Sequence, residues 1–336
     1  MPIRDPNAPS LTRRRLLHIL GGVPPALLLL GCSDSDGLGE SPTPTSPTSP
    51  AERVSSASTE GYFRITPGPD KHLIECNGVP NHLTGEFPNR GCPHAIRARA
   101  LRFEIPARPE IATAPRPIDG WLFGVAINGV VFDPTGPYFF EGTRRVMHFE
   151  VMSGDARPHL GLDFNNAHSQ PSGEYHYHGL PVGLLDGLGA NAAMTLIGYA
   201  ADGFPIYGPA GYDDATNAAS LVRAMRSSYR LRSGRRPEVV VGGEHDGTFV
   251  EDYVYVEGHG DLDECNGRFG VTPEYPDGIY HYYVTSQFPF VPRAWRGAPD
   301  PSFAHGSPGP DAVPPALRNY RGRMRTEFTA QQQERP

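Results

Sequence analysis

The chain reads Glu174-Tyr175-His176-Tyr177-His178-Gly179 near its middle, and this short run guides the interpretation of the whole fold. In an extended strand, successive side chains point to opposite faces. His176 and His178 would then share one face, with their Cα atoms about 7 Å apart, and Tyr175 and Tyr177 would share the other. The run therefore predicts a β-strand with an imidazole face and an aromatic face.

Similar short runs, rich in β-branched and aromatic residues, recur along the chain between clusters of Gly, Pro, Asn and Asp. They are 100–105, 120–131, 144–152, 194–199, 238–241, 249–256 and 279–285. With 37 prolines and 39 glycines, this pattern indicates many turns and few long helices. We predict an all-β or β-dominant α+β fold: a single large sandwich-like or barrel-like domain with one short helix and a C-terminal tail.

The short helix is expected at residues 218–229. Asp213 and Asp214 precede it as capping residues, and Leu221, Val222 and Met225 would lie on one side.

The N-terminus has the pattern of a bacterial export signal. A basic run that includes Arg13, Arg14 and Arg15 leads into an apolar stretch from Ile19 to Leu30. About a dozen apolar residues suit a signal peptide and are too few to span a bilayer, which takes roughly 20. Adjacent arginines followed by paired leucines match the twin-arginine type. We expect residues 1–31 to be a twin-arginine-type lipoprotein signal peptide.

The end of this segment, Leu29-Leu30-Gly31-Cys32, resembles a bacterial lipobox, in which the cysteine is acylated. Residues 32–59 are rich in Ser, Pro and Thr, so they cannot bury enough apolar surface to fold and are expected to be a disordered tether. The folded domain would cover 60–303, and 304–336 would be a C-terminal tail that could be helical. The expected location is the cell envelope: an exported protein, anchored to the lipid bilayer through acylated Cys32 and facing the periplasm or the cell surface.

The charge of the chain argues against one class of partner, and the motifs that it lacks argue against two classes of enzyme. Removal of residues 1–31 takes away four basic side chains and one acidic one, so the formal charge falls from −7 to about −10. An acidic surface without a basic aromatic stripe makes nucleic acid an unexpected partner. There is no Gly-x-Ser-x-Gly elbow and no phosphate-binding glycine loop, which argues against serine hydrolases and nucleotide-binding enzymes.

Three histidines fall within eleven residues: His168, His176 and His178. A turn at Pro171-Ser172-Gly173 could fold His168 back onto the imidazole face. Three neutral imidazoles that leave one position open are a common ligand set for zinc, copper or manganese. The alternative is a histidine network that hydrogen-bonds to backbone, carboxylates or a substrate. We favour the metal site.

A second run, Gly278-Ile279-Tyr280-His281-Tyr282-Tyr283, echoes the first, with His281 at the place of His176. The echo could mark an internal repeat, or two strands that both favour aromatic residues. Because it covers only six residues, we interpret it as two similar strands and keep His281 as a reserve metal ligand.

Three cysteines remain after Cys32, and Cys76–Cys92 is the simplest disulfide pair. It would close a loop of about 15 residues and contribute roughly 3 kcal/mol. Cys265 follows Asp263 and Glu264, whose charges would raise its pKa and argue against a nucleophile. It could be a buried core residue, a metal ligand or the partner of another cysteine; we favour burial and keep it as a reserve ligand.

Four segments in this order resemble the YHYH domain family of exported bacterial proteins. They are Glu75 to His82, Gly173 to Pro181 with its Tyr-His-Tyr-His core, Gly198 to Gly208, and Leu262 to Arg268. The resemblance spans roughly residues 60–290, and the lead-in Asn165-Asn166-Ala167-His168 supports grouping His168 with the other two histidines. The family has no assigned reaction, so the resemblance implies the domain and leaves open whether the chain is an enzyme.

Asp202 lies in the turn Ala201-Asp202-Gly203, where Asp-Gly favours a tight turn. If this turn borders the histidines, Asp202 could orient one imidazole by accepting its N–H. Two functions then remain in view: an exported metal-binding domain, or a non-catalytic module for glycan or protein. The second would use an exposed aromatic surface made of Tyr175, Tyr177, Tyr280 and Tyr282.

Overall fold

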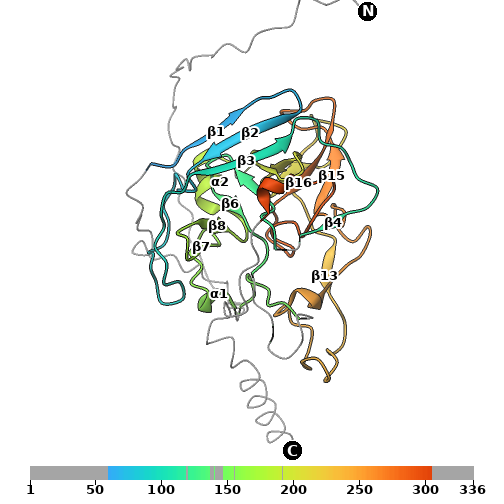
Figure 1. Ribbon diagram of the computed structural model, residues 1–336. Helices are drawn as coiled ribbons and strands as arrows, with labels where there is room; N and C mark the ends of the chain where they lie inside the picture. The colour runs from blue at the N-terminus through green and yellow to red at the C-terminus, as the bar shows by residue number, and fades with distance from the viewer. Residues whose placement is uncertain are drawn as a thin grey trace, which may run out of the picture. The chain divides into compact units, whose positions relative to one another are not determined.

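A computed structural model of the chain describes residues 60–118, 120–136, 140, 147–154, 156–190 and 192–304 (Figure 1). The predicted signal peptide, Cys32, the tether and the tail from residue 305 lie outside these residues. Within them the fold is β-dominant, as predicted, with two short α-helices, α1 (Ala156–His159) and α2 (Val182–Leu188). No helix in this part of the chain has the length and apolar character needed to cross a membrane.

The first three strands form a small antiparallel sheet. They are β1 (Phe63–Thr66), β2 (Lys71–Cys76) and β3 (Leu101–Pro106). Ile74, Phe103 and Ile105 alternate with more exposed residues along β2 and β3, as expected for a sheet with one buried face. These side chains join the main hydrophobic core, where Phe103 stacks on Phe303 with ring centroids 4.5 Å apart.

The main sheet is curled and has eight strands in the order β15-β16-β10-β9-β5-β6-β8-β7. The strands are β5 (Gly124–Ala126), β6 (Val131–Phe132), β7 (Ala167–Ser169), β8 (Tyr175–Tyr177), β9 (Leu196–Ala200), β10 (Pro205–Tyr207), β15 (Gly267–Gly270) and β16 (Ile279–Tyr283).

This strand order is symmetric about its centre. The central strands β5 and β9 are antiparallel, with Val125 opposite Tyr199. On each side an antiparallel hairpin (β5–β6 or β9–β10) is followed by a parallel pairing (β6–β8 or β10–β16) and then an antiparallel edge pair (β7–β8 or β15–β16). The sheet therefore consists of two halves with the same connectivity, related by an approximate two-fold axis. We call β5–β8 the first half and β9, β10, β15 and β16 the second half.

The matching extends to individual residues. Asn166 and Asn266 both have positive φ, 57° and 54°, at the turns before β7 and β15. Their carbonyls accept from the N–H groups of His178 and Tyr283, at 2.8 and 3.0 Å. The edge pairs keep the same register, with His168 opposite His176 and Arg268 opposite His281. The sequence echo at residues 278–283 is thus part of a structural repeat, and its interpretation as two merely similar strands was wrong.

Three two-stranded sheets complete the described fold. They pair β4 (Arg116–Pro117) with β17 (Ala294–Trp295), β11 (Ala210–Tyr212) with β12 (Val222–Ala224), and β13 (Tyr229–Leu231) with β14 (Tyr253–Tyr255). Two 3₁₀ turns lie at Val250–Asp252 and Pro301–Phe303.

The predicted helix at 218–229 is wrong, because this segment contains β12 and the first residue of β13. Leu221, assigned to the apolar side of that helix, is 81 % exposed, whereas Met225 is buried. Pairing of Val222–Ala224 with β11 satisfies the backbone of this segment instead. The predicted strand at 238–241 is also wrong, because these residues form a turn.

The predicted Cys76–Cys92 disulfide is absent: Cys76, Cys92 and Cys265 are all free and buried. The Sγ of Cys92 donates to the carbonyl of Ser169 at 3.0 Å, on the first half of the main sheet. Cys76 ends β2 and packs against Gly129. Sequence separation alone had suggested the pair, but the two thiols are directed to different neighbours.

Candidate metal centre

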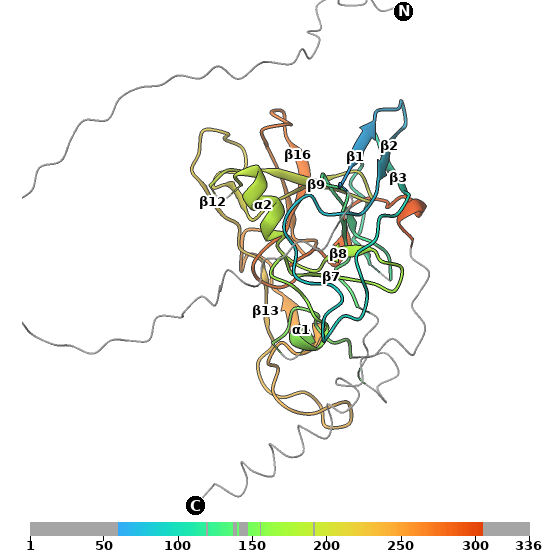
Figure 2. The same cartoon turned by 90° about the vertical axis from the view of Figure 1, so that its left-hand side faces the viewer.

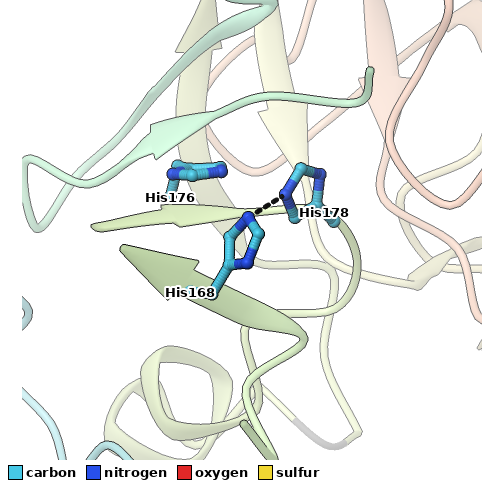
Figure 3. Close-up of side chains that lie close together, drawn as sticks. All are labelled: His168, His176 and His178. Carbon is cyan, nitrogen blue, oxygen red and sulfur yellow. Dashed lines mark hydrogen bonds between the residues drawn. The ribbon is translucent and has the colours of Figure 1, made fainter. Parts of the chain in front are cut away.

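The three histidines of the first half meet on one face of the β7–β8 hairpin. The turn through Pro171 and Gly173 reverses the chain, with Gly173 at φ +87°, and places His168 directly opposite His176. His178 lies two residues after His176 and so on the same face. The three residues are 6, 4 and 1 % exposed, and Figure 3 shows their rings close to one another.

The three rings form a compact triangle. Ring centroids are 4.7 Å apart for His168–His176 and His176–His178, and 5.0 Å apart for His168–His178. One nitrogen from each ring can be chosen so that all three lie within 4.8 Å of one another. The predicted grouping of these three histidines is therefore present in the structure.

The Nδ1 atoms of His168 and His176 contact backbone carbonyls, which makes Nε2 the nitrogen of each ring that can bind a metal. His168 donates Nδ1–H to the carbonyl of Leu160 at 2.7 Å, so its Nε2 carries a free lone pair. The Nδ1 of His176 lies 3.2 Å from the carbonyl of Glu174, a contact that favours the same tautomer. A backbone carbonyl on the outer nitrogen is the usual partner that orients a metal-binding imidazole.

His178 completes the set. Its Nε2 lies 3.2 Å from the Nε2 of His168, as the dashed line in Figure 3 shows. Two nitrogens bound to one tetrahedral zinc ion at about 2.0–2.1 Å would be about 3.3 Å apart. The Nδ1 of His178 is buried and has no hydrogen-bond partner among the described residues. The spacing and the orientation of these rings thus fit a shared metal ion.

Burial favours the neutral form of His168 and His178, which is the form that binds a metal. Desolvation lowers the pKa of His168 to about 4, despite the opposing effect of the Leu160 carbonyl. The pKa of His178 is also lowered well below its ordinary value, first by burial and then by His176, His168 and Arg293. Protons therefore compete only weakly with a metal ion for the nitrogens of His168 and His178.

A buried ion pair lies close to the histidines and was not anticipated from the sequence. Arg293 donates from Nη2 to Glu150 Oε2 at 2.7 Å, and the Glu150 side chain is fully buried. Desolvation raises the pKa of Glu150, although Arg293 opposes the shift. The two residues are 143 positions apart, so no local sequence signal could have linked them to the site.

Asp202 does not serve the histidines. Its carboxylate accepts from the hydroxyl of Tyr282 at 2.5 Å and from the N–H of Gly297 at 2.8 Å. Because side chains alternate along β16, Tyr282 points away from the face that carries His281. Asp202 therefore lies on the tyrosine side of the second half, and the expectation that it orients an imidazole is not supported.

The two reserve ligands also lie outside the triad. His281 is in the second half, where its Nδ1 lies 2.9 Å from the Ile279 carbonyl and its Nε2 lies 2.9 Å from the hydroxyl of Tyr283. Cys265 is buried, and desolvation, reinforced by Asp263, raises the pKa of its thiol well above the ordinary value. This agrees with the preferred interpretation of Cys265 as a buried residue.

The tyrosines of the two repeated strands face the core. Tyr175, Tyr177 and Tyr282 have no exposed surface, and Tyr280 is only 3 % exposed. Tyr175 donates to Asp163 at 2.7 Å, and Tyr280 donates to Asp263 at 2.9 Å. An exposed aromatic surface built from these four residues is therefore ruled out.

Comparison with known proteins agrees with the segments quoted from the sequence. No curated protein and no solved structure matches the chain significantly. The profile of one family, described as YHYH protein, matches residues 102–297. That range contains both halves of the main sheet and all three histidines of the triangle, and the chain belongs to the YHYH protein family.

Proposed function

We propose that this chain binds one transition metal ion through His168, His176 and His178. The observation that carries the proposal is the convergence of three buried imidazoles, two of which have their Nε2 atoms 3.2 Å apart. Purely neutral nitrogen ligands suit zinc or copper better than manganese, which prefers oxygen ligands. Three protein ligands leave a fourth position on such an ion for water or another small ligand.

Export and anchoring are part of the same proposal. The basic run, the short apolar stretch and the lipobox-like end support a signal peptide and acylation of Cys32. The domain would then bind its metal in the cell envelope while tethered to a bilayer. Twin-arginine export carries folded proteins, so the histidine triangle could be loaded before the chain crosses the membrane.

Metal content of the purified chain tests the binding proposal. After loading with zinc or copper(I) and removal of free ion, we expect about one equivalent by elemental analysis. The double variant His176→Ala/His178→Ala should retain almost none. His281→Ala is the matched control, because it removes the equivalent buried histidine of the second half and should leave the metal content unchanged. Equal, near-zero metal in the native chain and the double variant would contradict the proposal.

Anchoring has an independent test. Cys32→Ser should move the protein from the membrane fraction to the soluble fraction and abolish labelling with a radioactive fatty acid. Replacing Arg13 and Arg14 with lysine should instead leave the precursor in the cytoplasm. Unchanged membrane association of Cys32→Ser would refute the lipid anchor and leave the metal proposal standing.

A further inference from the structure

A second candidate site lies beside the β13–β14 hairpin, and none of the three histidines of the triangle lines it. It is a cavity of about 620 Å³, within the range of small-molecule sites. Met147, Pro237, Val240 and Val254 give it an apolar wall. The hairpin lies at the end of the domain opposite to the β1–β3 sheet (Figures 1 and 2).

Both carboxylates that line the cavity are already engaged. Asp252 accepts from Nε and Nη2 of Arg236, both at 2.6 Å, and the Arg236 side chain is 1 % exposed. Glu251 accepts the backbone N–H of His148 at 2.8 Å and contacts the Nδ1 of His148. Asp252 is thus paired with a buried guanidinium, and both carboxylate oxygens of Glu251 have hydrogen-bond partners on His148.

The segment that borders the cavity is unusually basic for an acidic protein. Six arginines lie within residues 223–236: Arg223, Arg226, Arg230, Arg232, Arg235 and Arg236. Four of them pair with carboxylates: Arg223 with Asp213 and Asp261, Arg226 with Asp261, Arg235 with Glu238 and Glu244, and Arg236 with Asp246 and Asp252.

The other two, Arg230 and Arg232, line the cavity. Among the described residues, no carboxylate lies within ion-pair distance of either one; Arg232 uses only its Nε, on the carbonyl of Glu251. Arg230 lies in β13, and Arg232 directly follows it and donates its backbone N–H to the Asp252 carbonyl, so the two side chains project to the same side of the hairpin. His245 also lines the cavity and uses its Nδ1 on the Gly234 carbonyl, which leaves its Nε2 for another partner.

We infer that this cavity binds a small organic anion, with its carboxylate or phosphate group at Arg230 and Arg232 and its apolar part against Met147, Val240 and Val254. Guanidinium groups bind such oxyanions through paired, charge-assisted hydrogen bonds. The apolar wall adds selectivity, because a bare inorganic anion would leave it wet. This site is independent of the metal centre.

The test uses phenyl phosphate and benzoate as probes on the full chain, with binding measured by titration calorimetry. Metal is first removed, so that the histidine triangle cannot hold the anion. We expect saturable binding of at least one probe, several-fold tighter than inorganic phosphate. Arg230→Gln/Arg232→Gln should weaken it by about tenfold or more. Arg235→Gln removes a nearby arginine that is paired with Glu244 and does not line the cavity, so it should change the affinity less than about twofold.

Each outcome either supports or overturns the proposed anion site. Loss of binding in the double variant, with little change in Arg235→Gln, supports the site. Equal weakening by both variants would show only general charge attraction and overturn it. Absence of saturable binding to both probes, or equal affinity for phenyl phosphate and inorganic phosphate, would also overturn it. Identical thermal melting of the variants and the native chain shows that these exposed substitutions leave the fold intact.

Discussion

The two halves of the main sheet share a backbone and differ in chemistry. The first half presents His168, His176 and His178 on one face, whereas the second half presents Arg268, His281 and Tyr283 at the equivalent positions. Both halves keep the same register and the same turn geometry before the edge strand. The hairpin therefore supplies the geometry of the candidate metal site, and two of its three histidine positions differ between the halves.

In the second half, the equivalent positions carry side chains that already contact one another. The Arg268 guanidinium lies over the Tyr283 ring, 5.6 Å from its centroid, and brings a permanent positive charge. Both nitrogens of His281 have partners, Ile279 and Tyr283. In the first half, by contrast, the Nε2 atoms of His168 and His178 face each other.

The largest effect should come from making the first half resemble the second. His178→Tyr replaces one ligand with the residue found at the equivalent place, so metal affinity should fall at least about 100-fold. Competition with a chromophoric chelator measures the affinity. Tyr283→Phe is the control, because it changes the matching position of the second half, and it should keep native affinity. Native affinity in His178→Tyr would remove His178 from the site.

The reverse change should build a second site. Arg268→His/Tyr283→His restores three histidines on the second half, and His281 already has the carbonyl contact that His176 makes. We expect the metal content to rise from about one to about two equivalents, with the new site weaker. Arg268→Gln/Tyr283→Phe removes the same native contacts without adding ligands and should stay at one. A content of one in both variants would show that the shared backbone is not enough.

Stability of the metal-free protein should depend on pH in both halves. His168 and His281 each have a pKa lowered to about 4, mainly by burial. The unfolded chain therefore binds more protons between about pH 4 and 6.5, and stability falls as the pH drops through that window. Protonation of each histidine lowers the free energy of unfolding by up to about 3 kcal/mol over this window.

Urea unfolding of the metal-free chain at several pH values measures this dependence. His281→Gln should reduce the loss of stability between pH 6.5 and pH 4, because one buried titrating group is gone. Bound metal should make the native chain resist acid further, until protons displace the ion. A flat pH profile for the metal-free native chain over this window would contradict the expected burial effect.

The smallest effect compares the two buried tyrosine–aspartate pairs. Asp163→Ala and Asp263→Ala each remove an acceptor for Tyr175 or Tyr280 and should destabilise the fold by about 1–3 kcal/mol. Asp163→Ala should cost more, because Asp163 also accepts from Gly85, 78 residues away, and so ties a distant loop to the hairpin. Urea midpoints of the two variants, measured at one pH, give the ranking, and a larger loss in Asp263→Ala would reverse it.

Local patterns were sufficient to predict the centre of the candidate site. The H-x-H spacing placed His176 and His178 on one face, and the Pro-Ser-Gly turn brought His168 to them, because both features act within one hairpin. The wrong predictions and the missed contacts involve residues whose partners lie outside the local segment. The local sequence of residues 218–229 fits a helix, but pairing of Val222–Ala224 with β11 makes part of it a strand. Glu150 and Arg293 meet only after folding.

The sequence shows the repeat only as a six-residue echo, for a related reason. The elements that the two halves share are short: the turns Asn128-Gly129 and Asp202-Gly203, the residues Asp163 and Asp263, and the two tyrosine-rich strands. Intervening stretches of different length separate them, 134–162 in one half and 208–262 in the other. The equivalence of the two halves is evident from their hydrogen bonds, because the N–H groups of His178 and Tyr283 donate to equivalent asparagine carbonyls.

The antiparallel pairing of β5 with β9 has an evolutionary consequence. Since Gly124 pairs with Ala200 and Ala126 with Gly198, the central contact is self-complementary. Two identical short polypeptides, each with four strands, could form this contact as a symmetric homodimer. Fusion of their genes would give the present order of strands. Once joined, the two copies could diverge in sequence on one shared backbone, one with three histidines and the other with Arg268, His281 and Tyr283.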